Sequence, residues 1–342
     1  MTTCLTVSTA ECFAACLASL ALLALLAAAF LTGWLAFAFA TAPSRWSLII
    51  HATSGFAIIA LLPWKSMIAR RGMRRAQPAR WASIMFGLLV VVSLAAGLLQ
   101  STGIALSIGP LSAMDFHVGG AIAAVPFAIW HVAARRVRLR PADMSRRAAL
   151  RGGAVLAGAA AAYAMSEVVV RASALPGAAR RFTGSYEAGS RNPDQLPVSS
   201  WMFDPVPAID TSDWSLRTPV RTWTYEQLCA FDDRMTATLD CTGGFYSTQD
   251  WAGVRLDRLI GDASGASIRV VSHTGYDRRF ALPSASNLLL ATRIGGRPLD
   301  PGHGFPVRLV AADQRGFWWV KWVVAIEVDD VPHWWQAPFP LQ

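Results

Sequence analysis

The sequence predicts a multidomain protein in which an all-α bundle of four to five transmembrane helices precedes a water-soluble α+β domain. Of the 342 residues, 54% are hydrophobic and only 15% are charged, which is too apolar for an ordinary soluble protein. The apolar residues are concentrated in long uncharged stretches of the first half. Beyond Arg171 the sequence is rich in Asp, Trp and Pro with short apolar runs, which is typical of a folded soluble domain.

Four uncharged stretches are each long enough for a membrane-crossing helix of about 20 residues. They lie between Glu11 and Arg45, between Arg45 and Lys65, between Arg80 and Asp115, and over 116–134. A milder stretch, rich in Gly and Ala, follows over 152–165. We therefore expect a four-helix membrane domain at 1–142, a signal-like fifth membrane helix with a linker at 143–178, and the soluble domain at 179–342.

The net charge of +9 belongs to the membrane half and gives no support to nucleic-acid binding. Residues 1–170 contain 14 Lys and Arg against 4 Asp and Glu, whereas 171–342 contain 17 against 18. The arginines cluster in two connections, 70–80 and 135–151. The positive-inside rule places both connections in the cytoplasm, so a fifth span would bring the C-terminal domain outside. The sequence thus predicts a multi-pass protein of the bacterial inner membrane with its soluble domain in the periplasm.

The start of the fifth stretch carries a more specific signal. Ser145–Arg151 contains paired arginines before an apolar run, and it resembles a twin-arginine export signal inside the chain. The alternative is that the pair is ordinary positive-inside charge. Ala172–Ala174 is an acceptable cleavage pattern. We expect the segment to remain as an anchor, because cleavage would separate the bundle from the soluble domain.

Three histidines lie within the apolar stretches, where a polar side chain is costly and therefore suggests a function. His117 and His131 are 14 positions apart, which places them on one helix face about 21 Å apart. His51 shares the outer depth of His117, because the second and fourth spans run in the same direction. Two facing imidazoles suit a bis-histidine haem. The alternative is a pair of histidines that only form hydrogen bonds between helices.

This arrangement resembles the membrane cytochrome b proteins, in which two helices each carry two histidines 14 residues apart. Here the position 14 beyond His51 is Lys65, so the resemblance is incomplete. We expect one haem b, on the outer side, ligated by His51 and His117. A second haem on Lys65 and His131 is left open, and His131 is otherwise an interfacial residue or part of a quinone pocket.

The soluble half places one cysteine in a turn that suits metal binding. In Thr238–Phe245, an extended run breaks at Cys241 into a turn with two glycines, whose backbone N–H groups favour a thiolate. Local sequence equally allows an inert buried thiol, or a disulfide with Cys229. The other cysteines are interpreted as small buried hydrophobes of the first span: Cys4, Cys12 and Cys16.

Four segments follow this turn in an order that is typical of a known family. They are a predicted turn and short helix at 251–260, a predicted strand at 267–272, and the runs 298–310 and 316–323. With the cysteine turn, they resemble the molybdopterin-binding domain of the sulfite oxidase family, including the periplasmic methionine sulfoxide reductases. The resemblance covers roughly 185–335. It implies that Cys241 binds the molybdenum of the cofactor, while the pterin and its phosphate are held by His303, Arg308 and Lys321.

Taken together, the two halves predict a membrane-anchored oxidoreductase that transfers an oxygen atom at the molybdenum and exchanges electrons with membrane quinone through the haem. The sequence neighbours of Cys241 are uncharged, which disfavours sulfite and favours a neutral small molecule such as a sulfoxide or N-oxide. Arginines from other loops could still enter the site: Arg221, Arg278 and Arg279. The alternatives are a sulfite dehydrogenase-type enzyme, a membrane electron conduit without catalysis, and a structural membrane protein.

Overall fold

The computed structural model describes residues 9–73, 80–105, 107–109, 111–134, 145–199 and 205–337. Cys4, the side chains of Cys12 and Cys16, and most of both arginine-rich connections lie outside the described residues. The chain forms two compact units. One contains Met1–Ala36 and Ala42–Gly184, and the other contains Phe37–Thr41 and Ser185–Gln342.

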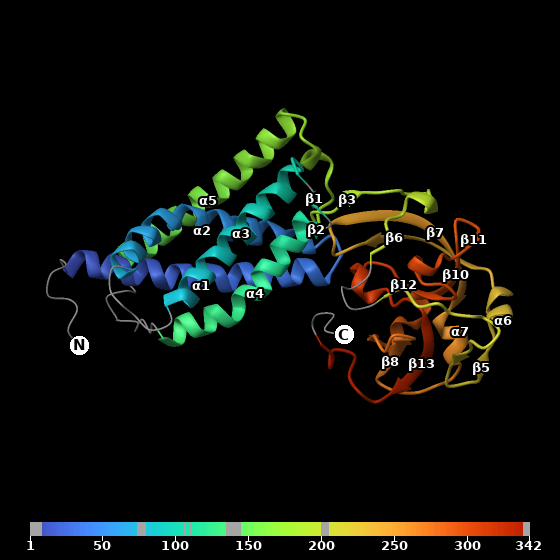
Figure 1. The fold of residues 1–342 in the computed structure, drawn as a ribbon. Helices are drawn as coiled ribbons and strands as arrows, with labels where there is room; N and C mark the ends of the chain where they lie inside the picture. The colour runs from blue at the N-terminus through green and yellow to red at the C-terminus, as the bar shows by residue number, and fades with distance from the viewer. Residues whose placement is uncertain are drawn as a thin grey trace. The chain divides into compact units, whose positions relative to one another are not determined.

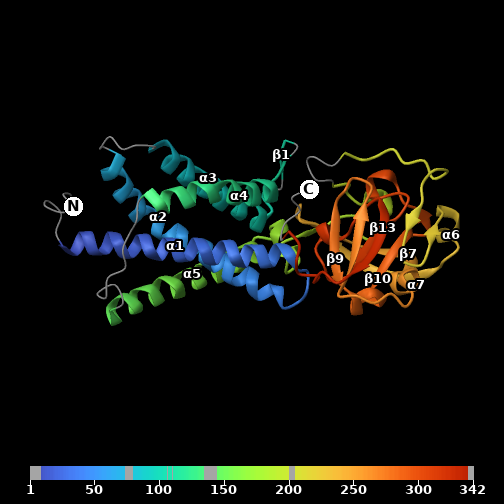
Figure 2. The same cartoon turned by 90° about the horizontal axis from the view of Figure 1, so that it is seen from below.

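The first unit is a bundle of five long helices (Figures 1 and 2). They are α1 (Thr9–Ala38), α2 (Ser44–Met73), α3 (Arg80–Thr102), α4 (Ala113–Ala134) and α5 (Arg146–Ala172). Each has a segment long and apolar enough to cross a membrane by length and composition. Helix α3 packs along α4, and α2 packs along α5. A short hairpin of β1 (Ser107–Ile108) and β2 (Leu111–Ser112) joins α3 to α4.

Specific contacts hold the fifth helix, α5, at its N-terminus and just after its C-terminus. Ser145 caps its N-terminus, where the side chain accepts a hydrogen bond from the Ala148 N–H. After its C-terminus, Gly177 packs against the last turn of α3, within the 3₁₀ turn Pro176–Ala179. Arg180 donates a hydrogen bond to the Ser101 carbonyl at 2.6 Å and forms an ion pair with Glu167. The segment after α5 is therefore built into the helical bundle.

The second unit contains two β-sheets. The six-stranded sheet is made of β3 (Tyr186–Glu187), β6 (Asp233–Asp240), β7 (Phe245–Arg255), β10 (Leu288–Ile294), β11 (Arg297–Pro298) and β12 (Arg308–Ala311). The five-stranded sheet has the order β5 (Thr222–Trp223), β4 (Leu216–Arg217), β13 (Val323–Asp329), β8 (Ser267–Ser272) and β9 (Asp277–Ala281). Most neighbouring strands are antiparallel, which makes this an α+β domain.

Short helices and 3₁₀ turns connect the strands. The helices are α6 (Tyr225–Cys229) and α7 (Leu256–Ile260), and the remaining 3₁₀ turns are Pro193–Gln195, Leu282–Asn287, Pro301–His303 and Gly316–Trp318. The predicted strand at 267–272 is confirmed as β8. The prediction of a turn at 251–255 is wrong, because these residues continue β7 and only Leu256–Ile260 is helical. Pairing with β6 and β10 keeps this stretch extended, and local sequence does not reveal that pairing.

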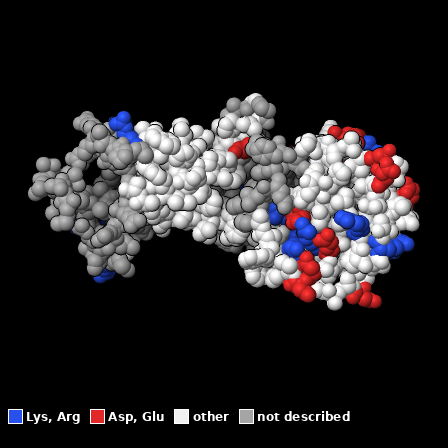
Figure 3. Space-filling view, turned by 60° about the horizontal axis from the view of Figure 1, so that its bottom comes forward, with Lys and Arg blue, Asp and Glu red and all other residues white. Residues whose placement is uncertain are grey.

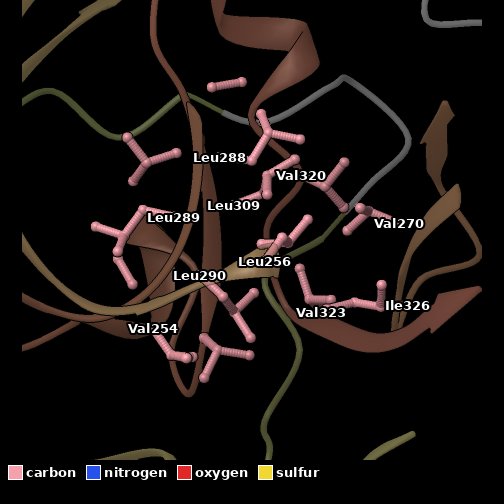
Figure 4. Close-up of a cluster of buried hydrophobic side chains, with 14 of the residues drawn as sticks. Val254, Leu256, Val270, Leu288, Leu289, Leu290, Leu309, Val320, Val323 and Ile326 are labelled. Carbon is pink, nitrogen blue, oxygen red and sulfur yellow. The ribbon is translucent and has the colours of Figure 1, made fainter. Parts of the chain in front are cut away.

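One continuous apolar core unites the two sheets. Leu289 and Leu309 of the six-stranded sheet belong to the same buried cluster as Val270 and Ile326 of the five-stranded sheet. Figure 4 draws these four side chains with other members of the cluster. Complete burial of such a side chain contributes about 1.5–3 kcal/mol, so this cluster is a main source of stability for the unit. The loops that carry the candidate site extend from this core.

Candidate functional site

Cys241 occupies the turn that the sequence predicts. Strand β6 ends at Asp240 and β7 begins at Phe245, and the turn is closed by a hydrogen bond from the Cys241 N–H to the Phe245 carbonyl at 2.8 Å. The Gly243 N–H points at the sulfur, with 3.3 Å between N and Sγ. The Ser199 hydroxyl also lies 3.3 Å from Sγ. Cys241 and Cys229 are both free thiols, so the alternative of a disulfide between them is not observed.

Arg308 is a buried cation close to this sulfur. Its guanidinium packs beside the paired rings of Trp251 and Trp319, 5.5 and 5.6 Å from their centroids. Burial lowers the pKa of Arg308 to about 10, and the charge of Cys241 opposes this shift. The side chain therefore remains protonated at neutral pH. Among the described residues Arg308 has no ion-pair partner, and its buried Nε has no hydrogen-bond acceptor. A buried cation in this state is expected to attract an anionic group.

His303 and Lys321 lie beside Arg308. The Arg308 Nη1 donates to the His303 carbonyl at 3.2 Å, and the Lys321 ammonium donates to the Gly302 and Ser199 carbonyls at 2.7 Å each. Ser199 thus touches both Lys321 and the sulfur of Cys241. The structure therefore brings Cys241, His303, Arg308 and Lys321 into one connected site.

The protonation of His303 can be deduced from its contacts. Its Nε2 lies 3.0 Å from the Leu196 carbonyl, which can only accept, so Nε2 carries the proton. Burial, and secondarily the positive charge of Arg308, lowers the pKa of His303 and favours the neutral ring. Nδ1 is then a lone-pair acceptor. It lies 3.5 Å from an Asp300 carboxylate oxygen, too far for a strong hydrogen bond. This nitrogen suits a donor N–H of a bound group better than a phosphate.

The arginines around the cysteine differ from those that local sequence suggested. Arg278 donates to the Tyr276 hydroxyl and the Ala337 carbonyl, and Arg279 is paired with Asp329. Arg221 stacks on the Trp223 ring. The described contacts of all three are away from Cys241.

Arg315, which the sequence analysis did not single out, contacts the cysteine instead. It is 2% exposed, and its Nη2 donates to the Cys241 carbonyl at 3.0 Å. The absence of basic residues next to Cys241 in the sequence was therefore a poor guide, because Arg308 and Arg315 approach it from distant segments. No local periodicity encodes such a long-range approach.

The helical unit holds a second candidate site at His51 and His117. The Nε2 atoms of the two rings face each other at 3.3 Å. The Nδ1 of His51 donates to the Ala29 carbonyl at 2.8 Å, and the Nδ1 of His117 donates to the Ser93 carbonyl at 2.7 Å. Because both Nδ1 atoms donate, two neutral rings would turn lone pairs toward each other. A metal between the rings would relieve this repulsion. Metal–imidazole bonds of about 2 Å require about 4 Å between the nitrogens, less than 1 Å wider than the observed separation.

His51 and His117 make the same kind of contacts with their neighbouring helices. Each ring packs against a glycine four residues after the carbonyl that holds it: Gly33 follows Ala29, and Gly97 follows Ser93. A Cβ at Gly33 would lie 2.9 Å from the His51 ring, and one at Gly97 would lie 3.0 Å from the His117 ring. The sequence analysis singled out other glycines, after the histidines, and missed these two on the neighbouring helices.

The repeat continues at the other end of the same helices. Lys65 and His131 each follow one of the paired histidines by 14 positions. Lys65 donates to the Ser19 hydroxyl at 3.2 Å, and the Nδ1 of His131 lies 3.1 Å from the Ser83 hydroxyl. Ser19 and Ser83 precede the two carbonyl residues, Ala29 and Ser93, by the same ten positions. Lys65 and His131 therefore occupy corresponding positions on α2 and α4, and each side chain contacts a serine of another helix.

Comparison with known proteins identifies the second unit. Residues 203–335 match the profile of the oxidoreductase molybdopterin binding domain. The chain contains a molybdopterin-binding oxidoreductase domain.

Two relatives found by sequence agree with this match, and one solved structure is also similar to part of the chain. The nitrate reductase [NAD(P)H] of Hordeum vulgare is 27% identical over 43% of this chain and 23% of its own length. The mitochondrial sulfite oxidase of Homo sapiens is 26% identical over 38% of this chain and 32% of its own length. The sulfane dehydrogenase SoxCD of Paracoccus pantotrophus overlaps with 37% of this chain and 40% of its own, at 23% identity and a TM-score of 0.35. The chain thus spans about a quarter to a third of the length of the two enzymes matched by sequence.

The residues of the oxidoreductase domain fit a molybdenum cofactor. The protein offers one thiol with two weak donors near it, a buried guanidinium with no carboxylate partner in the described part of the chain, and an imidazole nitrogen able to accept. A dithiolene pterin with a phosphate is anionic and carries N–H donors, so it complements all three groups. Soft thiolates also suit such a metal.

Proposed function

We propose that this protein is a membrane-anchored molybdenum-cofactor oxidoreductase that performs oxygen-atom transfer on a small molecule outside the cytoplasmic membrane. The observation that carries the proposal is the buried Arg308 guanidinium, without an ion-pair partner among the described residues, beside Cys241 in a molybdopterin-binding oxidoreductase domain. A structural domain has no evident reason to bury this charge, because an uncompensated buried cation is costly.

Each residue of the site has a definite task under this proposal. Cys241 supplies the single protein thiolate to the metal, and the Gly243 N–H supports its negative charge at 3.3 Å. Arg308 and Lys321 hold anionic parts of the cofactor, and His303 accepts a hydrogen bond from a pterin N–H through Nδ1. Two-electron oxygen-atom transfer is the chemistry that a molybdenum cofactor supplies when bound.

We expect a neutral substrate, such as a sulfoxide or an N-oxide. Three arginines that could have held an anion, Arg221, Arg278 and Arg279, are engaged with other partners. The charge of Arg315 is compensated by Asp240, whose Oδ1 lies 3.3 Å from its Nη1. With Arg308 assigned to the cofactor, none of these four arginines remains for an anionic substrate such as sulfite.

The helical unit supplies electron exchange in this proposal. His51 and His117 hold one haem b through their facing Nε2 atoms, and backbone carbonyls fix the orientation of both rings. A haem held there would supply one-electron transfer. Membrane quinone is the expected partner, and the end of the bundle with Lys65 and His131 offers it two polar groups inside apolar helices.

The location follows from the same proposal. The described face of the helical unit is nearly free of charged side chains, whereas the oxidoreductase domain displays both signs (Figure 3). Because the segment after α5 is built into the bundle, we infer that α5 is retained as an anchor. The oxidoreductase domain then lies on the periplasmic side, beyond a twin-arginine-like segment at Ser145–Arg151.

The decisive experiment compares C241S with C229S in detergent-purified protein from a host that makes the cofactor. We expect near-equal molybdenum and iron with a b-type spectrum in the wild type and in C229S. In C241S we expect loss of sulfoxide or N-oxide turnover with the haem spectrum intact. Unchanged turnover in C241S would reject the role of this thiol. Iron without molybdenum in the wild type would instead indicate a non-catalytic electron conduit.

A further inference from the structure

Arg315 is held against the backbone of the cysteine turn by several contacts. Its main chain forms a parallel bridge with Asp240, and its Nη2 donates to the Cys241 carbonyl at 3.0 Å. The next residue, Gly316, packs closely on the same turn, since a Cβ there would lie 3.1 Å from the Cys241 Cα. Arg315 and Gly316 therefore fix the position of the Cys241 backbone directly.

The charge of Arg315 is buried together with that of Asp240. Asp240 is 0% exposed, accepts a hydrogen bond from the Ser185 hydroxyl at 2.7 Å, and lies 3.3 Å from Arg315 Nη1. A planar guanidinium can contact a carboxylate and a carbonyl at the same time, which an ammonium on a flexible stem does less well. Apolar residues would stabilise a core at this place at lower cost. The ion pair is thus better explained by control of geometry than by stability.

The loop that carries Arg315 is held by the segment Phe37–Thr41. The Ala40 N–H donates to the Asp313 carbonyl at 3.2 Å, and Phe39 forms an antiparallel bridge with Gln314. The Trp318 indole N–H donates to the Ala38 carbonyl at 3.1 Å. This segment, Phe37–Thr41, belongs to the same compact unit as the oxidoreductase domain, although it begins at the end of α1.

We propose that Arg315 is a positioning residue for the Cys241 thiolate, and that the segment Phe37–Thr41 holds the loop that carries Arg315. Phe39 of this segment forms a bridge with Gln314. The residue after Gln314 is Arg315, which forms a bridge with Asp240, the residue before Cys241. The segment Phe37–Thr41 is thereby connected to the cysteine turn through two backbone bridges, Phe39 to Gln314 and Arg315 to Asp240. This inference rests on the proposed function for its catalytic meaning, but its structural part can be tested without the metal.

The test measures the alkylation rate of each free cysteine by mass spectrometry, in full-length protein from a host unable to make the cofactor. Arg293 provides a matched control, because it donates to the Cys229 carbonyl at 3.1 Å as Arg315 does to that of Cys241. We expect R315K to raise the rate at Cys241 about tenfold and leave Cys229 unchanged, since loss of a charged hydrogen bond permits local opening. R293K should do the reverse. Equal rates at Cys241 in the wild type and R315K overturn the proposal.

Two further measurements test the contribution of the segment Phe37–Thr41 and the effect of Arg315 in the cofactor-loaded enzyme. W318F keeps an aromatic side chain but removes the indole N–H that donates to Ala38, and it should raise the Cys241 rate by less than R315K does. An unchanged rate in W318F would remove the segment Phe37–Thr41 from the proposal. W318F also serves if R315K does not fold. In the cofactor-loaded enzyme, R315K should change the electron paramagnetic resonance spectrum of the one-electron-reduced metal and lower kcat, whereas R293K should not. If C241S retains molybdenum and turnover, the proposed function fails while the alkylation result still stands.

Discussion

At the scale of single residues, the placement of two glycines gives the haem proposal a sharp test. Gly33 leaves room for the His51 ring, and a Cβ there would lie 2.9 Å from two ring atoms. We expect G33A to displace the ring and to reduce the haem bound per protein severalfold, measured by the absorbance of the reduced b-type band. Gly87 of α3 has no atom within 4 Å of its Cβ position, so G87A is the matched control. Full haem content in G33A would contradict the assignment of His51.

The buried His303 predicts a pH dependence of stability. Because burial lowers the pKa of His303, the unfolded chain binds this proton first as the pH falls below the usual value of about 6.5. Stability is therefore lost from there down to the pKa of the folded state. We expect melting temperatures measured at about pH 7.5 and about pH 5.5 to differ more in the wild type than in H303Q. Equal differences in both proteins would show that His303 does not titrate between these values.

At the scale of helices, the junction after α5 tests whether this segment is a structural part of the bundle. A Cβ at Gly177 would lie 2.2 Å from the Ser101 carbonyl oxygen, which is backbone and cannot rotate away. We expect G177A to destabilise the helical unit by about 1–3 kcal/mol, the usual cost of overpacking, measured as a lower melting temperature in detergent. Gly158 of α5 has open space, so G158A should be neutral or stabilising. An unchanged melting temperature in G177A would argue against a packed junction.

The elements that could be predicted from the sequence are those that local pattern determines. The strand at Ser267–Ser272 and the turn at Cys241 were confirmed because strand propensity and paired glycines act over a few residues. The shared depth of His51 and His117 followed from helix geometry alone.

The missed features depend on contacts between distant segments. Residues 251–255 are extended because two other strands pair with them, and the glycines that touch the histidines lie on neighbouring helices. Arg315 reaches Cys241 across 74 positions, and Phe37–Thr41 joins a unit that otherwise begins at Ser185. Periodicity within one segment contains no information on any of these pairings.

At the scale of the whole molecule, the proposed orientation in the membrane follows from the charge distribution. The excess of Lys and Arg lies in the connections after the second and fourth helices, and the segment from Ser145 leads through α5 to the oxidoreductase domain. A cytoplasmic position for these connections and five spans require the C-terminal domain to be periplasmic. The alternative, a domain that remains inside, would need an even number of spans and leave the paired arginines of α5 without an export role.

Protease treatment of spheroplasts distinguishes the two orientations. The proposed orientation places the oxidoreductase domain outside, so we expect an external protease to degrade an epitope fused after Gln342. An epitope inserted into the 74–79 connection should remain protected until the membrane is permeabilised. Replacement of Arg146 and Arg147 by lysine keeps the positive charge but removes the twin-arginine pair. If the pair acts as an export signal, this variant should leave the C-terminal epitope protected. If the arginines act only as positive charge, the epitope should be degraded as in the wild type.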